Sequence, residues 1–502
     1  MNMNLKNIKW AAIALAGVLS LGSCDDFGDI NIDPNNPSET DTRYMFTFAC
    51  NRVYTFAWNG TYNPWTQMFP MYIAERQNVQ YGTFSVRDFS TQSYYYENIQ
   101  NLEEIIKMNT DPETMDAGNV IGFGSNANQI AAARTLKAFY YMHLTDALGM
   151  LPYSEAIKGL EGNFTPKYDT QEFIYEDLDR DLREAYAQFD ESGTLDDTYD
   201  ILYEGDITKW KKLNASLRMM MAIKLSDVNP TVGRERFAQA YADGGIEDNA
   251  DRLEYKFIAE QDNENILYTN IVRSGRRDFS PSMTIIDSLK SYNDPRLYAY
   301  ADPNEKGEYE GVPLGIDQSE VEKYKGRAEF DTRFWEQDAP MVVVPASHIL
   351  LLEAEAAVRG WINADAEDLY RRGIQASFDY YDVVGSMDEN DNSITYTDFD
   401  GYMAQPKVQL TGSESEKIYK IAMQRWLANY LQNGMEAWSD WRRLNVPTLV
   451  PGPAMVTTHI PYRRIYTNND YNANMDNYNA AIAAQGADTY DTRVWWDTKD
   501  NE

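Results

Sequence analysis

The chain has 502 residues, a formal net charge of −33 at pH 7 and an apolar content of 43%. The electrostatic field of this negative charge repels nucleic acids and anionic lipid surfaces but not neutral ligands. The apolar content is high enough for a large core, so the charge does not indicate disorder. The chain contains 36 tyrosines and 11 tryptophans against 19 phenylalanines. Tyrosine and tryptophan combine a flat apolar face with a polar tip, so they suit sugar-binding surfaces as well as cores.

The first 23 residues are organised like a lipoprotein signal peptide. Lys6 and Lys9 precede a short apolar run at 10–21 ("WAAIALAGVLSL"), about half of the roughly 20 residues that span a bilayer. The next residues, "LGSC" at 21–24, resemble a bacterial lipobox, in which the cysteine thiol receives the lipid and becomes the new N-terminus. We therefore predict cleavage after residue 23 and lipidation of Cys24. An ordinary signal peptide followed by a chance cysteine is the alternative.

A polar segment, 24–40, follows the predicted cleavage site. Asp25, Asp26 and Asp29 come directly after Cys24, which resembles the surface-export signal of Bacteroidetes-type lipoproteins. We predict a tether that holds the protein, lipid-anchored, on the outer face of the outer membrane. Cleavage would remove two lysines and no acid, which makes the chain two charges more negative. Cys50 would then be the only other cysteine, so we expect no intrachain disulfide and an inert thiol buried among apolar neighbours.

Beyond the tether, helical periodicity dominates the chain. Thr170 is a plausible N-cap, Gly149 and Pro152 end one predicted helix, and Pro230 ends another. The predicted helices cover 128–148, 170–189, 206–228, 347–361, 364–381 and 415–432. Helices of this length in pairs predict a tetratricopeptide-like hairpin scaffold, although the strict 34-residue signature is absent.

Long insertions rich in aromatic and polar residues separate the predicted helices. They cover 59–93, 251–345, 383–412 and 446–502. Loops of this length within a compact chain are usually functional. We predict a single domain, 24–502, that is mostly α with minor β and carries irregular aromatic-rich insertions.

No pattern indicates catalysis, a metal or a cofactor. His143, His348 and His459 lie far apart, and zinc, Walker A and nucleophile-elbow motifs are absent. Glu353 and Glu355 are two apart on a predicted helix and should point to different sides, a poor geometry for glycoside hydrolysis. The 78 acidic residues nevertheless supply other pairs by chance, so a surface glycosidase stays open as a rival.

Eight motifs, in order, resemble the SusD/RagB family of Bacteroidetes outer-membrane lipoproteins, and its SusD-like branch in particular. The first is the tether "INIDPNNPSE", and the second is "AARTLKAFYYMHLTDALGMLPYSEA" at 132–156, in which Met150 replaces a common Asp. "YDTQEFIYEDLDRDLREA", "GDITKWKKLNASLRMMMAIKL", "YNDPRL" and "HILLLEAEAAVRGW" follow. The C-terminal third supplies "IAMQRWLANYLQNGMEAWSDWRRLNVP" and "HIPYRRIYTNNDYNANMDNYNAA".

The resemblance implies a function as well as a helical fold. It implies a surface lipoprotein that binds nutrient oligosaccharides and sits as a lid on a SusC-type TonB-dependent transporter. An oligopeptide cargo shares every motif and stays open as an alternative. The family's ligand platform is aromatic and lies in the insertions, which by position offers Trp65, Arg76, Tyr81, Phe84, Tyr268, Phe334 and Trp335. Any of these side chains could instead pack beneath a loop.

Overall fold

The structure is a computed structural model, and it describes residues 40–57, 64–86, 92–383 and 398–499. The predicted signal peptide, Cys24 and almost all of the tether lie outside these residues. Cys50 is buried, as predicted, and burial raises the pKa of its thiol well above the usual value. Within the described ranges, no helix combines the length and the hydropathy needed to cross a bilayer.

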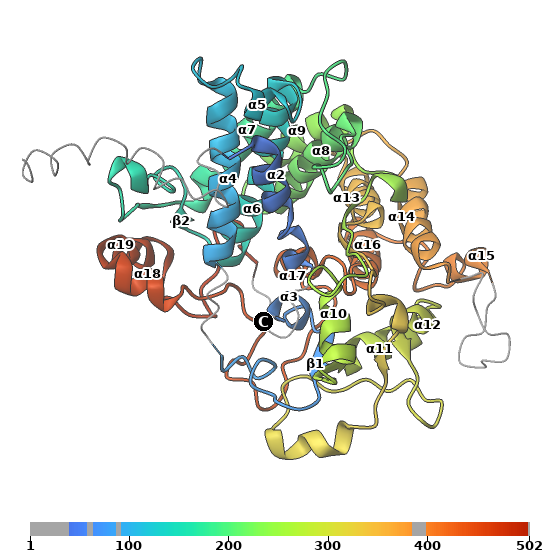
Figure 1. Ribbon diagram of the computed structural model, residues 1–502. Helices are drawn as coiled ribbons and strands as arrows, with labels where there is room; N and C mark the ends of the chain where they lie inside the picture. The colour runs from blue at the N-terminus through green and yellow to red at the C-terminus, as the bar shows by residue number, and fades with distance from the viewer. Residues whose placement is uncertain (1–39, 58–63, 87–91, 384–397, 500–502) are drawn as a thin grey trace, which may run out of the picture.

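Paired helices form the scaffold (Figure 1). Neighbours in the chain pack against one another, α4 on α6, α6 on α7, α7 on α8 and α8 on α9, and α13 packs on both α14 and α16. The main helices are α2 (Thr42–Cys50), α4 (Gln92–Thr110), α6 (Asn126–Leu148), α7 (Gln171–Gln188), α8 (Ile207–Lys224), α9 (Pro230–Asp243), α13 (Ala346–Val358), α14 (Ala366–Tyr381), α16 (Glu414–Ala428) and α17 (Gly434–Leu444). This arrangement confirms the predicted mostly α, tetratricopeptide-like fold.

Local signals fix most of the helix ends. The Thr170 hydroxyl accepts a hydrogen bond from the Phe173 N–H at 3.2 Å, which caps α7. Gly149 ends α6 with φ of 77°, a left-handed value that favours glycine. Pro230, predicted only to end a helix, is also the first residue of α9, where its missing N–H costs no helical hydrogen bond.

Strands are few and short, as predicted. β1 (Ile73–Glu75) pairs with β5 (Phe279–Pro281), and β2 (Leu151–Pro152) pairs with β3 (Tyr168–Asp169). β4 (Leu253–Tyr255) pairs with β8 (Met341–Val344), and β6 (Ala301–Asp302) pairs with β7 (Glu329–Phe330). All four pairs are antiparallel, and the β1–β5 pair joins the 251–345 insertion to the N-terminal part of the chain.

The insertions contain more helix than the sequence predicted. Their short helices are α3 (Trp65–Met68), α10 (Ile266–Tyr268), α11 (Met283–Ser291), α12 (Leu297–Tyr300), α15 (Phe399–Met403), α18 (Asn468–Ala473) and α19 (Met475–Gln485); α5 (Gly118–Ile121) lies between α4 and α6. Elements as short as α3 and α10 leave too little periodicity to be seen in the sequence.

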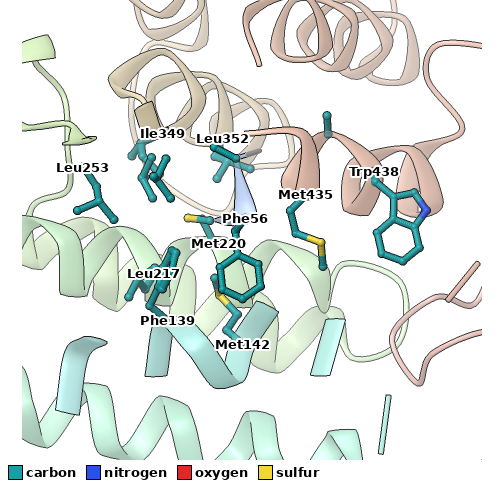
Figure 2. Packing of buried hydrophobic residues seen from close by; sticks show 14 of the residues in the cluster. Phe56, Phe139, Met142, Leu217, Met220, Leu253, Ile349, Leu352, Met435 and Trp438 are labelled. Carbon is teal, nitrogen blue, oxygen red and sulfur yellow. The ribbon is translucent and has the colours of Figure 1, made fainter. Parts of the chain in front are cut away.

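The core lies where the helical layers meet (Figure 2). Phe139 of α6, Met220 of α8, Leu352 of α13 and Trp438 of α17 are all buried in one hydrophobic cluster. Phe56, which follows α2, packs edge-on against Phe139 with ring centroids 5.5 Å apart. Segments from both halves of the sequence therefore share one core.

A buried ionic cluster joins α6, α8 and α17. The Lys224 ammonium lies 2.6 Å from Asp146 and 2.6 Å from Glu436, and all three side chains are almost completely buried. The Trp496 indole N–H donates to Asp146 at 2.8 Å. Burial lowers the pKa of the neighbouring His143 to about 4, so this imidazole is neutral at pH 7. The cluster holds the C-terminal segment against the scaffold.

Candidate functional site

Trp65 and Phe84, two of the predicted ligand-binding residues, lie in the core. Each side chain is 3% exposed. Trp65 packs edge-on against Trp438 with centroids 5.8 Å apart, and the Arg464 guanidinium lies 4.5 Å from its ring centroid. Phe84 packs edge-on against Phe69 at 5.2 Å. Both rings therefore contribute packing and offer no open face to a ligand.

Tyr81 lies with these two residues around a small internal cavity. The cavity holds about 10 Å³, far less than a sugar ring occupies. Tyr81 is half-buried, and burial, with Glu75 nearby, raises the pKa of its hydroxyl. The three residues belong to one cluster in the N-terminal part of the chain, and that cluster is mainly interior.

The 251–345 insertion forms a crevice beside Trp335, which we call the Trp335 crevice. Trp335 is half-buried, its indole N–H donates to the Phe330 carbonyl at 3.2 Å, and the Arg277 guanidinium lies 5.8 Å from its ring centroid. Arg277 also pairs with Glu329 of β7. The crevice encloses about 20 Å³, room for about one water molecule, so a sugar ring would lie across its rim.

Arg76, which directly follows β1, contacts the same carboxylate, that of Glu329. One of its nitrogens lies 2.9 Å from a Glu329 oxygen, and another donates to the Lys325 carbonyl. The Arg76 side chain is only 10% exposed, and burial lowers the pKa of its guanidinium. Glu329 is therefore shared by two arginines, the mostly buried Arg76 and the exposed Arg277 beside Trp335.

Phe334 lines a second, larger hollow, which we call the Tyr381 cavity. This cavity holds about 260 Å³ and includes Tyr380, Tyr381 and Gln432 in its lining. The Phe334 and Tyr381 rings are 6.0 Å apart, and the Gln432 amide donates to the Tyr381 hydroxyl at 2.6 Å. Because Phe334 and Trp335 are consecutive, one short turn places an aromatic side chain at each hollow.

Tyr268 lies beside the Trp335 crevice without lining it. The Arg273 guanidinium is 5.7 Å from its ring centroid, and Arg273 pairs with the buried Glu264 at 2.5 Å. The adjacent residue Leu267 does line the crevice. Tyr268 is half-buried, so part of its surface stays available on that side.

Sequence reasoning missed several residues that the structure brings to these two hollows. Arg277 and Glu329 lie at the Trp335 crevice, and Arg333, Tyr380 and Tyr381 lie at the Tyr381 cavity. The dipeptide Tyr380–Tyr381 carried a usable signal, because it ends a predicted helix just before an insertion. Arg277 carried none, since its partner Glu329 is distant in sequence.

The chemistry of both hollows suits a neutral, hydroxyl-rich ligand. Arg276 lies 2.8 Å from Asp278, and Arg333 lies 2.7 Å from Asp331, so each of these two guanidinium groups has its own carboxylate, while Arg76 and Arg277 share Glu329. Such pairs present planar donors and acceptors without a large net charge. Among the described carboxyl groups near this region, Glu75 is the one with a strongly shifted pKa. Burial raises this pKa to about 8, and the carboxylate accepts a hydrogen bond from the Gly82 N–H at 2.7 Å.

Comparisons with known proteins agree with the fold. A family model described as starch-binding and associating with the outer membrane matches residues 34–467. A solved structure of a chitin-binding protein shares 28% identity, with a TM-score of 0.74, over 91% of this chain and 99% of its own. A chitin-binding SusD homologue from Flavobacterium johnsoniae (23% identity, TM-score 0.76) covers 92% of this chain and 100% of its own.

A SusD homologue from Bacteroides fragilis has 24% identity and a TM-score of 0.76 over 92% of this chain and 100% of its own. The comparison with curated proteins gives no match. The family match covers most of the chain and agrees with the motifs and the helical pairs. The chain belongs to the SusD/RagB family of nutrient-binding proteins associated with the outer membrane.

Proposed function

We propose that this protein binds neutral nutrient oligosaccharides at the cell surface and delivers them to a SusC-type TonB-dependent transporter, on which it sits as a lid. The observation that carries the carbohydrate assignment is the pair of consecutive half-buried aromatics, Phe334 and Trp335, at two adjoining hollows lined by charge-matched polar groups. An aromatic ring can stack on the apolar face of a sugar, while arginine–carboxylate pairs can form hydrogen bonds with the sugar hydroxyls.

The names of the relatives suggest which sugars to test first. The family is described as starch-binding, and two structural relatives are called chitin-binding. Chitohexaose and maltoheptaose are therefore the first probes. The full mature chain in detergent should bind at least one of them in a calorimetric titration, and Trp335→Ala should weaken that binding about tenfold, the loss of one good stacking contact.

Phe48→Ala is the matched control, because Phe48 is an exposed phenylalanine of α2 that lines neither hollow. Unchanged affinity in Trp335→Ala would remove the Trp335 crevice from the binding site. Absence of binding by wild-type protein, together with binding of neutral oligopeptides, would favour the peptide alternative over carbohydrate.

The transporter partnership has its own test. Tagged protein should recover a TonB-dependent barrel from native outer membranes in mild detergent, and deletion of the gene should reduce glycan uptake. Recovery of the lipoprotein alone, with undiminished uptake, would contradict the lid role.

A surface glycosidase is the remaining rival. We propose that the protein is not an enzyme, and support comes from the two hollows, where Asp278, Glu329 and Asp331 are each paired with an arginine. Incubation with a glycan panel should leave every substrate intact. Cleavage that is lost in Glu75→Gln, the variant of the one strongly shifted carboxyl nearby, would favour the enzyme.

A further inference from the structure

A wide groove lies on the helical scaffold, between α4, the middle of α6, α7 and the loop that joins β2 to β3. We call it the α4 groove. It holds about 830 Å³, the largest volume among the hollows described here, and shares no lining residue with the Trp335 crevice or the Tyr381 cavity. Figure 1 shows α4 and β2 on the same side of the molecule, away from α10 and α11. A volume of several hundred Å³ is typical of small-molecule sites.

Aromatic and apolar side chains form the floor and the rim of the α4 groove. Tyr141 and Tyr153 meet edge to face with centroids 4.6 Å apart. Phe164 and Leu160, both on the β2–β3 loop, are 77% and 99% exposed. Covering such exposed apolar side chains is favourable, so a ligand that lies against them gains binding free energy.

Several ionic groups of the α4 groove are already paired. Lys137 lies 3.1 Å from Glu103 and 3.4 Å from Asp181, and Tyr153 donates to Asp177 at 2.7 Å. The lining carries four carboxylates and three lysines, so a ligand with a formal charge would meet little net opposite charge there. Hydroxyl and amide groups of a neutral ligand could still share these donors and acceptors.

Hydrogen bonds anchor the β2–β3 loop next to Phe164. The Asn474 and Asn477 side chains of the α18–α19 region donate to the carbonyls of Pro166 and Thr165, at 2.6 and 2.9 Å. Lys158 donates to the Ser154 carbonyl at 2.9 Å. A rim that is already ordered loses little entropy when a ligand binds.

Two further features of this loop lower the stability of the folded protein. Ile157 has φ of 63°, a left-handed value that is strained for a β-branched residue. The Ser154 hydroxyl is buried at the groove and has no hydrogen-bond partner among the described residues. Strain and an unmet hydroxyl are expected where a loop is shaped for a ligand.

We propose that the α4 groove is a second binding site for neutral oligosaccharides, with Phe164 stacking on a sugar ring. This proposal rests on the carbohydrate class proposed above for the insertion face. Two sites on opposite parts of one chain would let the protein hold a long polysaccharide at two points, which raises the effective concentration of the second contact.

The test is a calorimetric titration of the full mature chain with chitohexaose and with maltoheptaose, in wild type, Phe164→Ala, Trp335→Ala and the control Phe48→Ala. Phe164 is so exposed that its truncation should leave the fold intact, which the melting curve checks. We expect two sites per chain in the wild type. Phe164→Ala should weaken one of them about tenfold, and Trp335→Ala the other.

The outcomes separate this inference from the proposed function. A single site that Trp335→Ala weakens and Phe164→Ala leaves unchanged overturns the second site but keeps the proposed function. A neutral peptide such as tetra-alanine that competes for the Phe164-dependent site overturns the carbohydrate assignment of the α4 groove. Absence of binding to either oligosaccharide overturns both proposals.

Discussion

Glu353 and Glu355 lie two residues apart on α13, both completely buried, and only Glu355 is paired. Glu355 accepts from Arg425 at 2.9 Å and from Arg443 at 2.5 and 2.8 Å. Neither carboxylate oxygen of Glu353 has a hydrogen-bond partner among the described residues. Their different environments set opposite charge states. The arginines hold the pKa of Glu355 well below its usual value against the effect of burial, while burial raises the pKa of Glu353 to about 8.

Glu353→Gln should therefore stabilise the protein at alkaline pH. Between the ordinary pKa of 4.5 and the folded value of about 8, the folded chain binds a proton that the unfolded chain has lost. The stability contributed by neutral Glu353 is fully present below pH 4.5 and is lost as the pH rises through about 8. Urea unfolding should show a gain on the order of 2 kcal/mol for the variant at pH 9 relative to pH 5.

Glu355→Gln is the matched control with the opposite sign. It leaves two buried arginines short of a counter-charge, so it should cost about 3–5 kcal/mol at neutral pH. Equal effects of the two substitutions across the pH range would contradict the assigned charge states.

Trp496→Ala should destabilise the whole protein. The Arg442 guanidinium lies between two indoles, 3.6 Å from the Trp438 centroid and 4.5 Å from the Trp496 centroid, and Trp496 also bonds to Asp146. Truncation should cost about 3–5 kcal/mol in denaturant unfolding. The neighbouring Trp495 is only half-buried, so Trp495→Ala should cost clearly less. A smaller loss for Trp496→Ala than for Trp495→Ala would show that the C-terminal segment is not held as described.

Trp65→Ala and Trp335→Ala should affect different properties. Trp65 is a core residue, so its truncation should lower the free energy of unfolding by about 3–5 kcal/mol. Trp335 is half-buried, so its truncation should act mainly on oligosaccharide affinity, with a stability change of about 1 kcal/mol. Thermal melts and calorimetric titrations on both variants check this division. A well-folded Trp65→Ala protein that has lost oligosaccharide binding would show that Trp65 belongs to the ligand site.

Cys24→Ala should release the protein from the membrane fraction. The prediction rests on the lipobox-like residues 21–24, since a chain without the thiol cannot receive the lipid. Fractionation and surface proteolysis of cells that produce either form would measure the change. The control is Cys50→Ala, which removes the other cysteine and leaves the lipobox intact. Membrane-bound, surface-exposed Cys24→Ala protein would contradict the lipid anchor.

Sequence alone determined the helical class and the motifs that identify the family. Helix periodicity and capping depend on neighbours within a few residues, so Thr170 and Gly149 could be read directly as helix ends. Even Pro230 was correctly seen as a break, although only the structure shows that it also begins α9. Four short antiparallel strand pairs were foreseen only as minor β, because pairing partners such as β1 and β5 lie far apart in the chain.

Tertiary structure alone decided which of the candidate aromatic residues keep an accessible surface. Trp65 and Trp335 are equally plausible in the sequence, but Trp438 and Arg464, from distant segments, cover the first. No distant segment buries Trp335 to the same degree, and Arg277 and Glu329 gather beside it instead. The same holds for Glu353 and Glu355, whose spacing predicted different surroundings without saying which would find arginines. Exposure and pairing depend on contacts between remote parts of the chain, and a single sequence does not encode those contacts in any local pattern.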